Sequence, residues 1–261
     1  MTTTRPFPGM MLNPLHPLSK NLVGGWLFNE GAGSGLHDTS GNGNNGALIN
    51  TVLSDWVGSS DGGALNFDGV DAYVNIGSSD VFDFTSEDFS LCLRINPDTL
   101  SVDDGDTFGD SLLLDRGEFN VSGYVLQHSS AAPIGALQFI TSQSGAFQFT
   151  SSSGGILNVG QWSNIVVTRS GATVRIYHNG VEVPYSLQGT HEDPGSLSRD
   201  FLIGRLFSSA ARWHFDGKMQ YVFIYKDRVL TMEDAVDLNS DPYKMFLPTS
   251  PSLASIAVPS Q

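Results

Sequence analysis

The segment at residues 38–46, with the sequence DTSGNGNNG, concentrates the side chains that are best suited to bind a hard cation. Asp38, Asn42 and Asn44 offer carboxylate and amide oxygens, and oxygen ligands of this kind are those that Ca²⁺ prefers. The glycines and asparagines also tolerate left-handed backbone conformations, which a tight turn between two strands requires. The segment therefore has two interpretations, a calcium-binding loop and a compact structural connection.

A second acidic run lies at residues 103–110 and is followed by Asp115. Counted from Asp104, Gly109 and Asp115 stand at the positions of the EF-hand glycine and of its last ligand. However, Phe108 replaces a ligand, and no helical pattern flanks the run. We expect a solvated loop here rather than a calcium site.

Aromatic side chains in or beside predicted loops offer another kind of chemistry, the stacking of sugar rings. Carbohydrate sites combine an apolar platform with a few polar groups that bind the hydroxyls. Trp26 and Trp162 lie next to predicted strands, so we expect them to pack in the core. The candidate carbohydrate-binding residues are Trp56, Tyr185, His191 and Trp213.

The sequence shows no recognisable arrangement of catalytic residues. A Gly-x-Ser-x-Gly elbow, a His-Glu-x-x-His helix and a Walker loop are all absent. The six histidines are scattered without metal-ligand spacing. Retaining glycoside hydrolysis needs two carboxyl groups about 5–5.5 Å apart, and the six glutamates are isolated from one another in the sequence. We predict a protein that is not an enzyme.

The charge balance excludes some partners. The chain has 27 acidic and 13 basic residues, a formal net charge of −14, which argues against binding to nucleic acid or to an anionic membrane. Cys92 is the only cysteine, so an internal disulfide cannot form. The N-terminus lacks the apolar stretch of an export signal, and no run approaches eighteen consecutive apolar residues.

Short apolar runs separated by Gly, Ser and Asn predict an all-β chain between residues 22 and 225. Asn179-Gly180 lies between two such runs and indicates a hairpin turn, because both residues tolerate positive φ. Alternation along residues 89–95 places Cys92 on the face opposite the core-directed side chains. One helix is predicted to begin after Thr231, whose side chain and Asp234 match a capping pattern, and to end near Asn239.

The two ends of the chain are apolar but irregular. Residues 1–21 carry Pro6, Pro8, Pro14 and Pro17 among apolar side chains, so this segment cannot form a helix or a central strand. It is a disordered leader, a strap on the surface of its own domain, or an arm that binds a neighbouring subunit. We divide the chain into an N-terminal arm (1–21), a single domain (22–243) and a C-terminal tail (244–261).

Several motifs resemble the laminin-G-like branch of the concanavalin A-like lectin/glucanase superfamily. They are residues 38–46, residues 64–74 (ALNFDGVDAYV), Trp162 and residues 174–181 (VRIYHNGV). The resemblance runs from about Leu22 to Leu238 and implies an antiparallel β-sandwich jelly roll. The glucanases of this superfamily share a Glu-x-Asp-x-x-Glu strand, which this chain lacks. In relatives, the loop aspartate and an acidic pair in the last strand form a metal or structural network.

Gln220 and Tyr221 stand where many relatives carry that acidic pair. The amide of Gln220 removes charge from a divalent site, although its oxygen can still be a ligand. The resemblance therefore implies a structural Ca²⁺ held by Asp38, Asn42, Asn44 and Gln220 as one alternative, and no bound cofactor as the other.

The flanking motifs resemble those of laminin-G-like proteins encoded by tailed bacteriophages. They are residues 13–19 (NPLHPLS), residues 22–31 (LVGGWLFNEG), Asp241-Pro242-Tyr243 and Phe246-Leu247-Pro248. This resemblance implies a virion structural protein, such as a capsid decoration, a head fibre or a tail component. Such a protein would be a homo-oligomer and would bind other virion proteins through its arms. It would also bind host-surface glycans. The alternative is a soluble lectin that binds carbohydrate with or without calcium.

Overall fold

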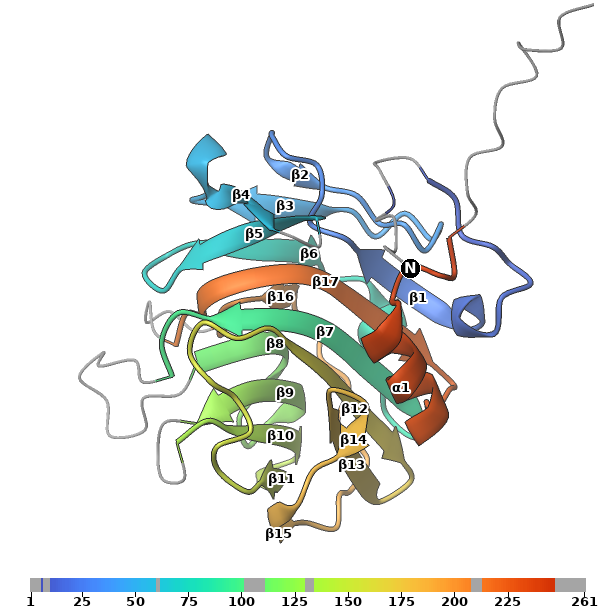
Figure 1. Ribbon diagram of the computed structural model, residues 1–261. Coiled ribbons are helices and arrows are strands. Elements are labelled where there is room, and N and C mark those ends of the chain that lie inside the picture. Colours follow the sequence, from blue (N-terminus) through green and yellow to red (C-terminus); the bar gives the residue numbers. More distant parts are fainter. Residues whose placement is uncertain are drawn as a thin grey trace, which may run out of the picture.

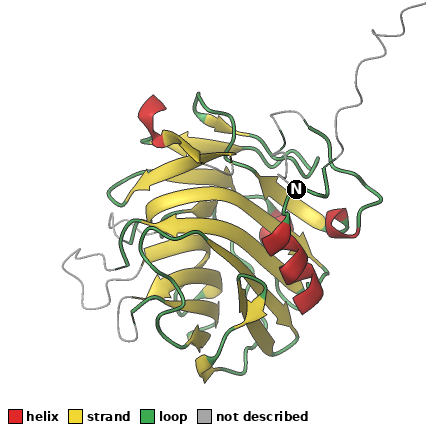
Figure 2. Ribbon diagram, viewed as in Figure 1, coloured by secondary structure: helices red, strands yellow, loops and turns green. Residues whose placement is uncertain are grey.

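The computed structural model describes Pro6 and residues 10–59, 62–100, 111–129, 134–207 and 213–246. They form two antiparallel β-sheets packed face to face, with one α-helix near the C-terminal end (Figures 1 and 2). This arrangement confirms the predicted all-β sandwich jelly roll with one short helix. Among these residues, no helix has the length and apolarity needed to cross a lipid bilayer.

The first sheet is built around the long strand β17, which pairs with β7 on one side and with β5 and β1 on the other. In spatial order its strands are β14 (Val181–Glu182), β13 (Thr173–His178), β12 (Ser163–Ser170), β7 (Phe89–Pro97), β17 (Asp216–Lys226), β5 (Gly62–Asp68) and β4 (Trp56–Ser59), with β1 (Leu22–Trp26) on β17.

The second sheet packs against the first and is composed largely of hairpin-connected strands. In spatial order these are β15 (Tyr185–Gln188), β11 (Ala146–Ser152), β10 (Ala136–Gln143), β9 (Ser122–Ser129), β8 (Ser111–Glu118), β16 (Phe201–Ile203), β6 (Tyr73–Gly77), β3 (Gly46–Ile49) and β2 (Gly35–Leu36). Three 3-10 turns, Pro17–Ser19, Leu53–Asp55 and Asp80–Phe82, lie in the connections of the described chain.

The main core lies between the sheets and is rich in aromatic rings. Phe84 stacks on Phe89 with ring centroids 4.5 Å apart and on Tyr124 at 5.3 Å. Every second residue of β7 is directed into this core, whereas Cys92 belongs to a separate buried cluster on the other face of the first sheet. The predicted position of Cys92 away from the main core is therefore confirmed.

Helix α1 (Met232–Ser240) covers that other face of the first sheet (Figure 1). The Thr231 hydroxyl accepts a hydrogen bond from Asp234 N, and the Asp234 carboxylate accepts one from Thr231 N, so the predicted capping pattern is confirmed. The Asn179-Gly180 turn between β13 and β14 is confirmed as well, because both residues have positive φ, 51° and 84°.

Residues 10–21 and 244–246 also lie on this face and pair with each other. Leu12 and Phe246 form an isolated antiparallel bridge, and Asn13 N donates to Met245 O at 2.8 Å. The Tyr225 hydroxyl donates to Leu18 O. The buried cluster on the first sheet thus runs across the boundaries at residues 21 and 244. Residues 1–5, 7–9 and 247–261 of the predicted arm and tail are outside the described chain.

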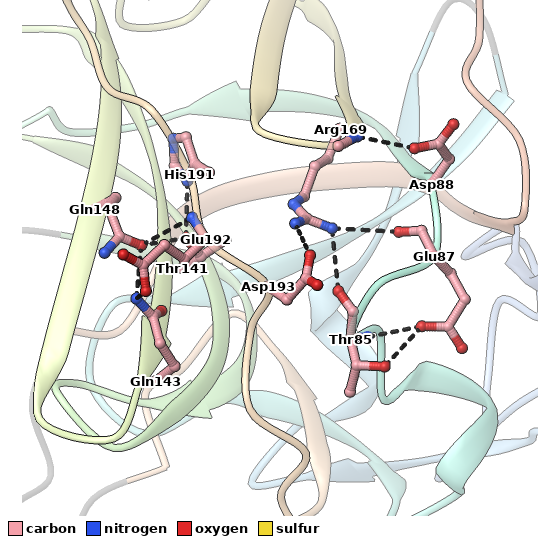
Figure 3. A network of polar contacts seen from close by, with 11 residues as sticks. Thr85, Glu87, Asp88, Thr141, Gln143, Gln148, Arg169, His191, Glu192 and Asp193 are labelled. Atoms are coloured by element: carbon pink, nitrogen blue, oxygen red, sulfur yellow. Dashed lines mark hydrogen bonds and ion pairs between the residues drawn. The ribbon is translucent and has the colours of Figure 1, made fainter.

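An irregular segment at residues 189–200 crosses one end of the sandwich and is fixed by polar contacts (Figure 3). The His191 imidazole lies between two threonine hydroxyls, 2.8 Å from Thr141 Oγ1 and 3.0 Å from Thr150 Oγ1. Next to it, the buried Arg169 guanidinium pairs with Asp193 at 2.5 Å. Burial, with a smaller contribution from the charge of Arg169, lowers the pKa of His191 to about 4.

This environment predicts a loss of stability in acid. Because the folded protein lowers the pKa of His191, the stabilisation is complete above the unfolded value of 6.5 and is lost as the pH falls toward 4. A shift of this size corresponds to on the order of 3 kcal/mol at pH 4. Urea unfolding between pH 7 and pH 4 should therefore show a smaller acid loss for His191→Gln, which retains a donor and an acceptor for the two threonines.

The comparison with wild type matters because other buried groups titrate in the same range. Burial raises the pKa of Asp115 to about 6 and lowers that of His128 to about 4, and both effects are present in wild type and variant alike. His37→Gln, which removes an imidazole at an exposed position, is the matched control. Equal acid losses in wild type and His191→Gln would contradict the prediction.

Candidate functional site

A groove of about 510 Å³ lies on the outer face of the second sheet. Along β9 and β10, Tyr124, Leu126, Leu137 and Phe139 are directed into the core, so the residues between them are directed outward. The groove is mainly apolar, and none of the described residues that line it is ionisable. The lining residues are Phe119, Val125, Gln127, Ser129, Gln138, Ile140, Phe147, Phe149, Leu206 and Trp213.

The pairing register arranges the groove floor in rows across β9, β10 and β11. One row is apolar, because Ile140 is opposite both Val125 and Phe149. The next row is polar, because Gln138 is opposite both Gln127 and Ser151. These three polar side chains are joined by hydrogen bonds. Gln127 Nε2 donates to Gln138 Oε1 at 2.8 Å, and Gln138 Nε2 donates to Ser151 Oγ at 2.9 Å.

An aromatic wall forms one side of the groove. The rings of Phe147 and Phe149 are nearly parallel, with centroids 6.1 Å apart. The ring centroids of Phe119 and Phe147 are 4.3 Å apart. Phe119 and Phe147 retain exposed fractions of 53% and 39%. Rings of this size are normally buried, so a row that remains open to solvent offers a surface for a ligand.

Leu206 and Trp213 form the opposite wall, and β8 fixes the chain on both sides of them. Trp213 O accepts a hydrogen bond from Leu112 N at 3.1 Å. The buried Asp115 carboxylate accepts hydrogen bonds from Phe207 N at 2.6 Å and from Gly117 N. Trp213 Nε1 is buried and has no acceptor among the described residues.

Of the four residues predicted to bind carbohydrate, the structure places Trp213 in this groove. Trp56 begins β4 in the first sheet and packs against the main core. The Tyr185 hydroxyl donates to Glu182 and accepts from Ile176 N, on β15. His191 is buried between Thr141 and Thr150, with an exposed fraction of 2%.

The sequence analysis did not single out the remaining groove residues, although one signal was available. Phe147 and Phe149 alternate with Gln148, which indicates a strand with an aromatic face. Neighbouring residues of β9, such as Val125 and Leu126, are both apolar although they point to opposite faces. This pattern also indicates a strand that is covered on both faces.

The loop at residues 38–46 is a compact hydrogen-bonded turn. The Asp38 carboxylate accepts hydrogen bonds from three backbone N–H groups, those of Gly25 at 3.0 Å, Ser40 at 2.9 Å and Asn44 at 2.9 Å. The side-chain amides of Asn42 and Asn44 donate to carbonyl groups of β1. These contacts join the loop to the first strand, as the structural interpretation of the segment requires.

Gln220, the fourth residue of the predicted calcium site, comes from the last strand of the chain. It is fully buried in β17, at the point where the pairing register with β7 shifts between Met219 and Tyr221. In the described part of the chain, no group of three or more His, Cys, Asp or Glu side chains is arranged to hold a metal ion. The acidic run at 103–110 is outside the described residues, and calcium binding at Asp38 stays a prediction.

Replacement of Asp38 separates the two interpretations of the loop. Asp38→Ala leaves three backbone N–H groups without their acceptor, so we expect the free energy of unfolding to fall by roughly 2–4 kcal/mol. Urea unfolding with Ca²⁺ and with a chelator measures both effects. The calcium interpretation additionally requires that Ca²⁺ stabilise wild type but not the variant.

The exposed Asp71 supplies a matched control, because Asp71→Ala removes the same charge without this network. A wild-type midpoint that is the same with calcium and with chelator would exclude calcium at this loop. A loss for Asp38→Ala no larger than that for Asp71→Ala would contradict the structural role as well.

Comparison with solved structures gives the same fold at low sequence identity. The binding domain of Paraclostridial Mosquitocidal Protein 1 matches with a TM-score of 0.63, 15% identity, and coverage of 85% of this chain and 52% of that chain. The receptor binding domain of botulinum neurotoxin D matches with a TM-score of 0.60, 14% identity, and coverage of 85% and 53%. The chain thus spans about half the length of these two binding domains.

Domain 4 of AbnA, a GH43 extracellular arabinanase from Geobacillus stearothermophilus, was solved in complex with arabinotriose. It matches with a TM-score of 0.58, 17% identity, and coverage of 84% of this chain and 98% of that domain. No curated protein sequence matches. The family model described as the concanavalin A-like lectin/glucanases superfamily matches residues 68–235, which include most strands of both sheets. By fold and by this match, the chain belongs to that superfamily.

Proposed function

We propose that this protein is a non-catalytic carbohydrate-binding module that holds a glycan in the groove of the second sheet. The observation that carries the proposal is the position of the aromatic wall, Phe147 and Phe149, beside the polar row of Gln127 and Gln138. Aromatic faces contact the C–H groups of a sugar ring, and carboxamides donate to and accept from its hydroxyls. Both requirements of a sugar site are met within one groove.

The charge of the groove supports binding without catalysis. Retaining hydrolysis needs two carboxyl groups about 5–5.5 Å apart, and the described lining residues contain no carboxyl group. The arabinotriose complex of the structurally similar arabinanase domain is consistent with a sugar ligand on this fold. The match to toxin binding domains is consistent with a recognition role.

Trp213 and Phe149 should be required for binding. Removal of one stacking ring costs about 1.4 kcal/mol or more, which is about a tenfold loss of affinity. A glycan array followed by calorimetric titration of the best ligand should show this loss for Trp213→Ala and for Phe149→Ala. Trp56→Ala is the matched control, because it removes an indole on the first sheet. Wild-type affinity in both Trp213→Ala and Phe149→Ala would exclude the groove as the site.

We further propose that the module belongs to a phage virion, as a capsid decoration, head fibre or tail component with several copies per particle. The flanking sequence motifs motivate this proposal, and the arrangement of the fold is compatible with it. The paired segments around Leu12 and Phe246 lie near β1 and α1, whereas β9–β11 lie toward the other end of the molecule (Figure 1). Attachment through the terminal segments would leave the groove accessible, and multiple copies would compensate for weak single sites.

Gradient sedimentation of particles from the source lysate, followed by peptide mass spectrometry, tests the virion proposal. We expect the chain to co-migrate with capsid protein in a fixed stoichiometry, and the copy number would separate decoration from a tail part. Its absence from purified particles would overturn the virion role and leave a free lectin, whose binding the glycan array measures independently.

A further inference from the structure

We propose that the groove selects a neutral N-acetylated amino sugar, an inference that rests on the proposed binding of a glycan there. The acetamido group of such a sugar has two parts, a polar amide and an apolar methyl group. The groove floor has two adjacent rows of matching character, the Gln127–Gln138–Ser151 row and the Val125–Ile140–Phe149 row. We assign the amide to the first row and the methyl group to the second.

The rows are fixed by backbone pairing, so their separation follows from strand geometry. Side chains on the same face of a strand are two residues apart, which at about 3.3 Å per residue gives about 6.6 Å. Gln138 and Ile140 are such neighbours on β10, and Gln127 and Val125 are such neighbours on β9. A single substituent of a sugar ring can therefore reach both rows, with its amide over one and its methyl over the other.

The Gln138 carboxamide has the hydrogen-bonding capacity that an acetamido group needs. Its Nε2 carries two hydrogens, of which one is donated to Ser151 Oγ, and its Oε1 has two lone pairs, of which one accepts from Gln127. The second hydrogen can be donated to an acetamido oxygen, and the second lone pair can accept from an acetamido N–H. The bonds to Gln127 and Ser151 hold the carboxamide in this orientation before the ligand arrives.

The apolar row discriminates against an ordinary sugar hydroxyl. A hydroxyl placed over Val125 and Ile140 would lose its hydrogen bonds to water without replacement, whereas a methyl group gains from leaving water. One methyl-sized group in an apolar pocket is worth about 1–3 kcal/mol, or about 10-fold to 200-fold in affinity. Because the described lining residues carry no charge, this selection should not depend on salt.

Ligand-observed NMR titration of two matched sugar pairs tests the inference. The pairs are the methyl β-glycosides of N-acetylglucosamine and glucose, and those of N-acetylgalactosamine and galactose. Within each pair the sugars differ only in acetamido against hydroxyl. We expect the N-acetylated member of at least one pair to bind about tenfold more tightly, at low and at high salt alike. Its acetyl methyl protons should receive the strongest saturation transfer from the protein.

Two substitutions locate the selection in the groove. Gln138→Leu removes the carboxamide and should weaken the preference. Ile140→Ser removes the apolar contact and should bring the N-acetylated sugar close to the affinity of its partner. Thermal unfolding of both variants checks that they fold, and Trp56→Ala should retain the wild-type preference. Persistence of the preference in both folded variants would overturn the assignment of the two rows.

The outcomes separate this inference from the proposed function. If the non-acetylated sugars bind as tightly and Trp213→Ala abolishes that binding, the groove is a glycan site but the selection is wrong. If neither member of either pair binds and the glycan array is also negative, the proposed function itself fails. Preferential binding of a carboxylated sugar that weakens with salt would overturn the neutral ligand class.

Discussion

The structure depends on the central position of β17 in the first sheet. This strand comes late in the chain, yet it hydrogen-bonds along one edge to β7 and along the other to β5 and β1. Its alternating side chains contribute both to the core between the sheets and to the cluster beneath α1. Both hydrophobic layers therefore require the same strand. Since most of these pairings join residues far apart in sequence, the sandwich cannot close until the C-terminal part of the chain is available.

The groove follows from the same kind of constraint in the second sheet. The hairpins of β8, β9, β10 and β11 fix a register in which residues distant in sequence form rows. Val125, Ile140 and Phe149 lie in one row, and the polar side chains of Gln127 and Gln138 lie in the next. The backbone hydrogen bonds of the sheet determine these rows, so the rows are arranged before any ligand is present. Such preorganisation reduces the entropy lost on binding.

Local signals in the sequence allowed the all-β class and several turns to be predicted, whereas the jelly-roll arrangement was predicted from the resemblance of the motifs to laminin-G-like domains. Asn179-Gly180 predicts a hairpin, the Thr231 and Asp234 side chains predict a helix start, and alternation around Cys92 predicts which side chains point into the main core. The groove could not be predicted in the same way, because the register that joins β9 to β10 and β11 is a property of pairs of strands. Trp213 was identified from its loop position alone. His191 was predicted to bind carbohydrate because it lies in or beside a predicted loop, whereas Thr141 and Thr150 supply hydrogen bonds that allow it to be buried.

The bridge between Leu12 and Phe246 brings the first and last segments of the described chain side by side. Since these two residues are paired neighbours, a short linker could join the segments that contain them without crossing a sheet. New termini could then be opened at the exposed turn after Ser170, where Gly171 has positive φ and an added Cβ would meet no atom within 4 Å. A circularly permuted protein of this kind would keep every strand pairing of both sheets except for fraying at the new ends. The fold is thus defined by which strands are neighbours in space, and it does not depend on which loop contains the chain ends.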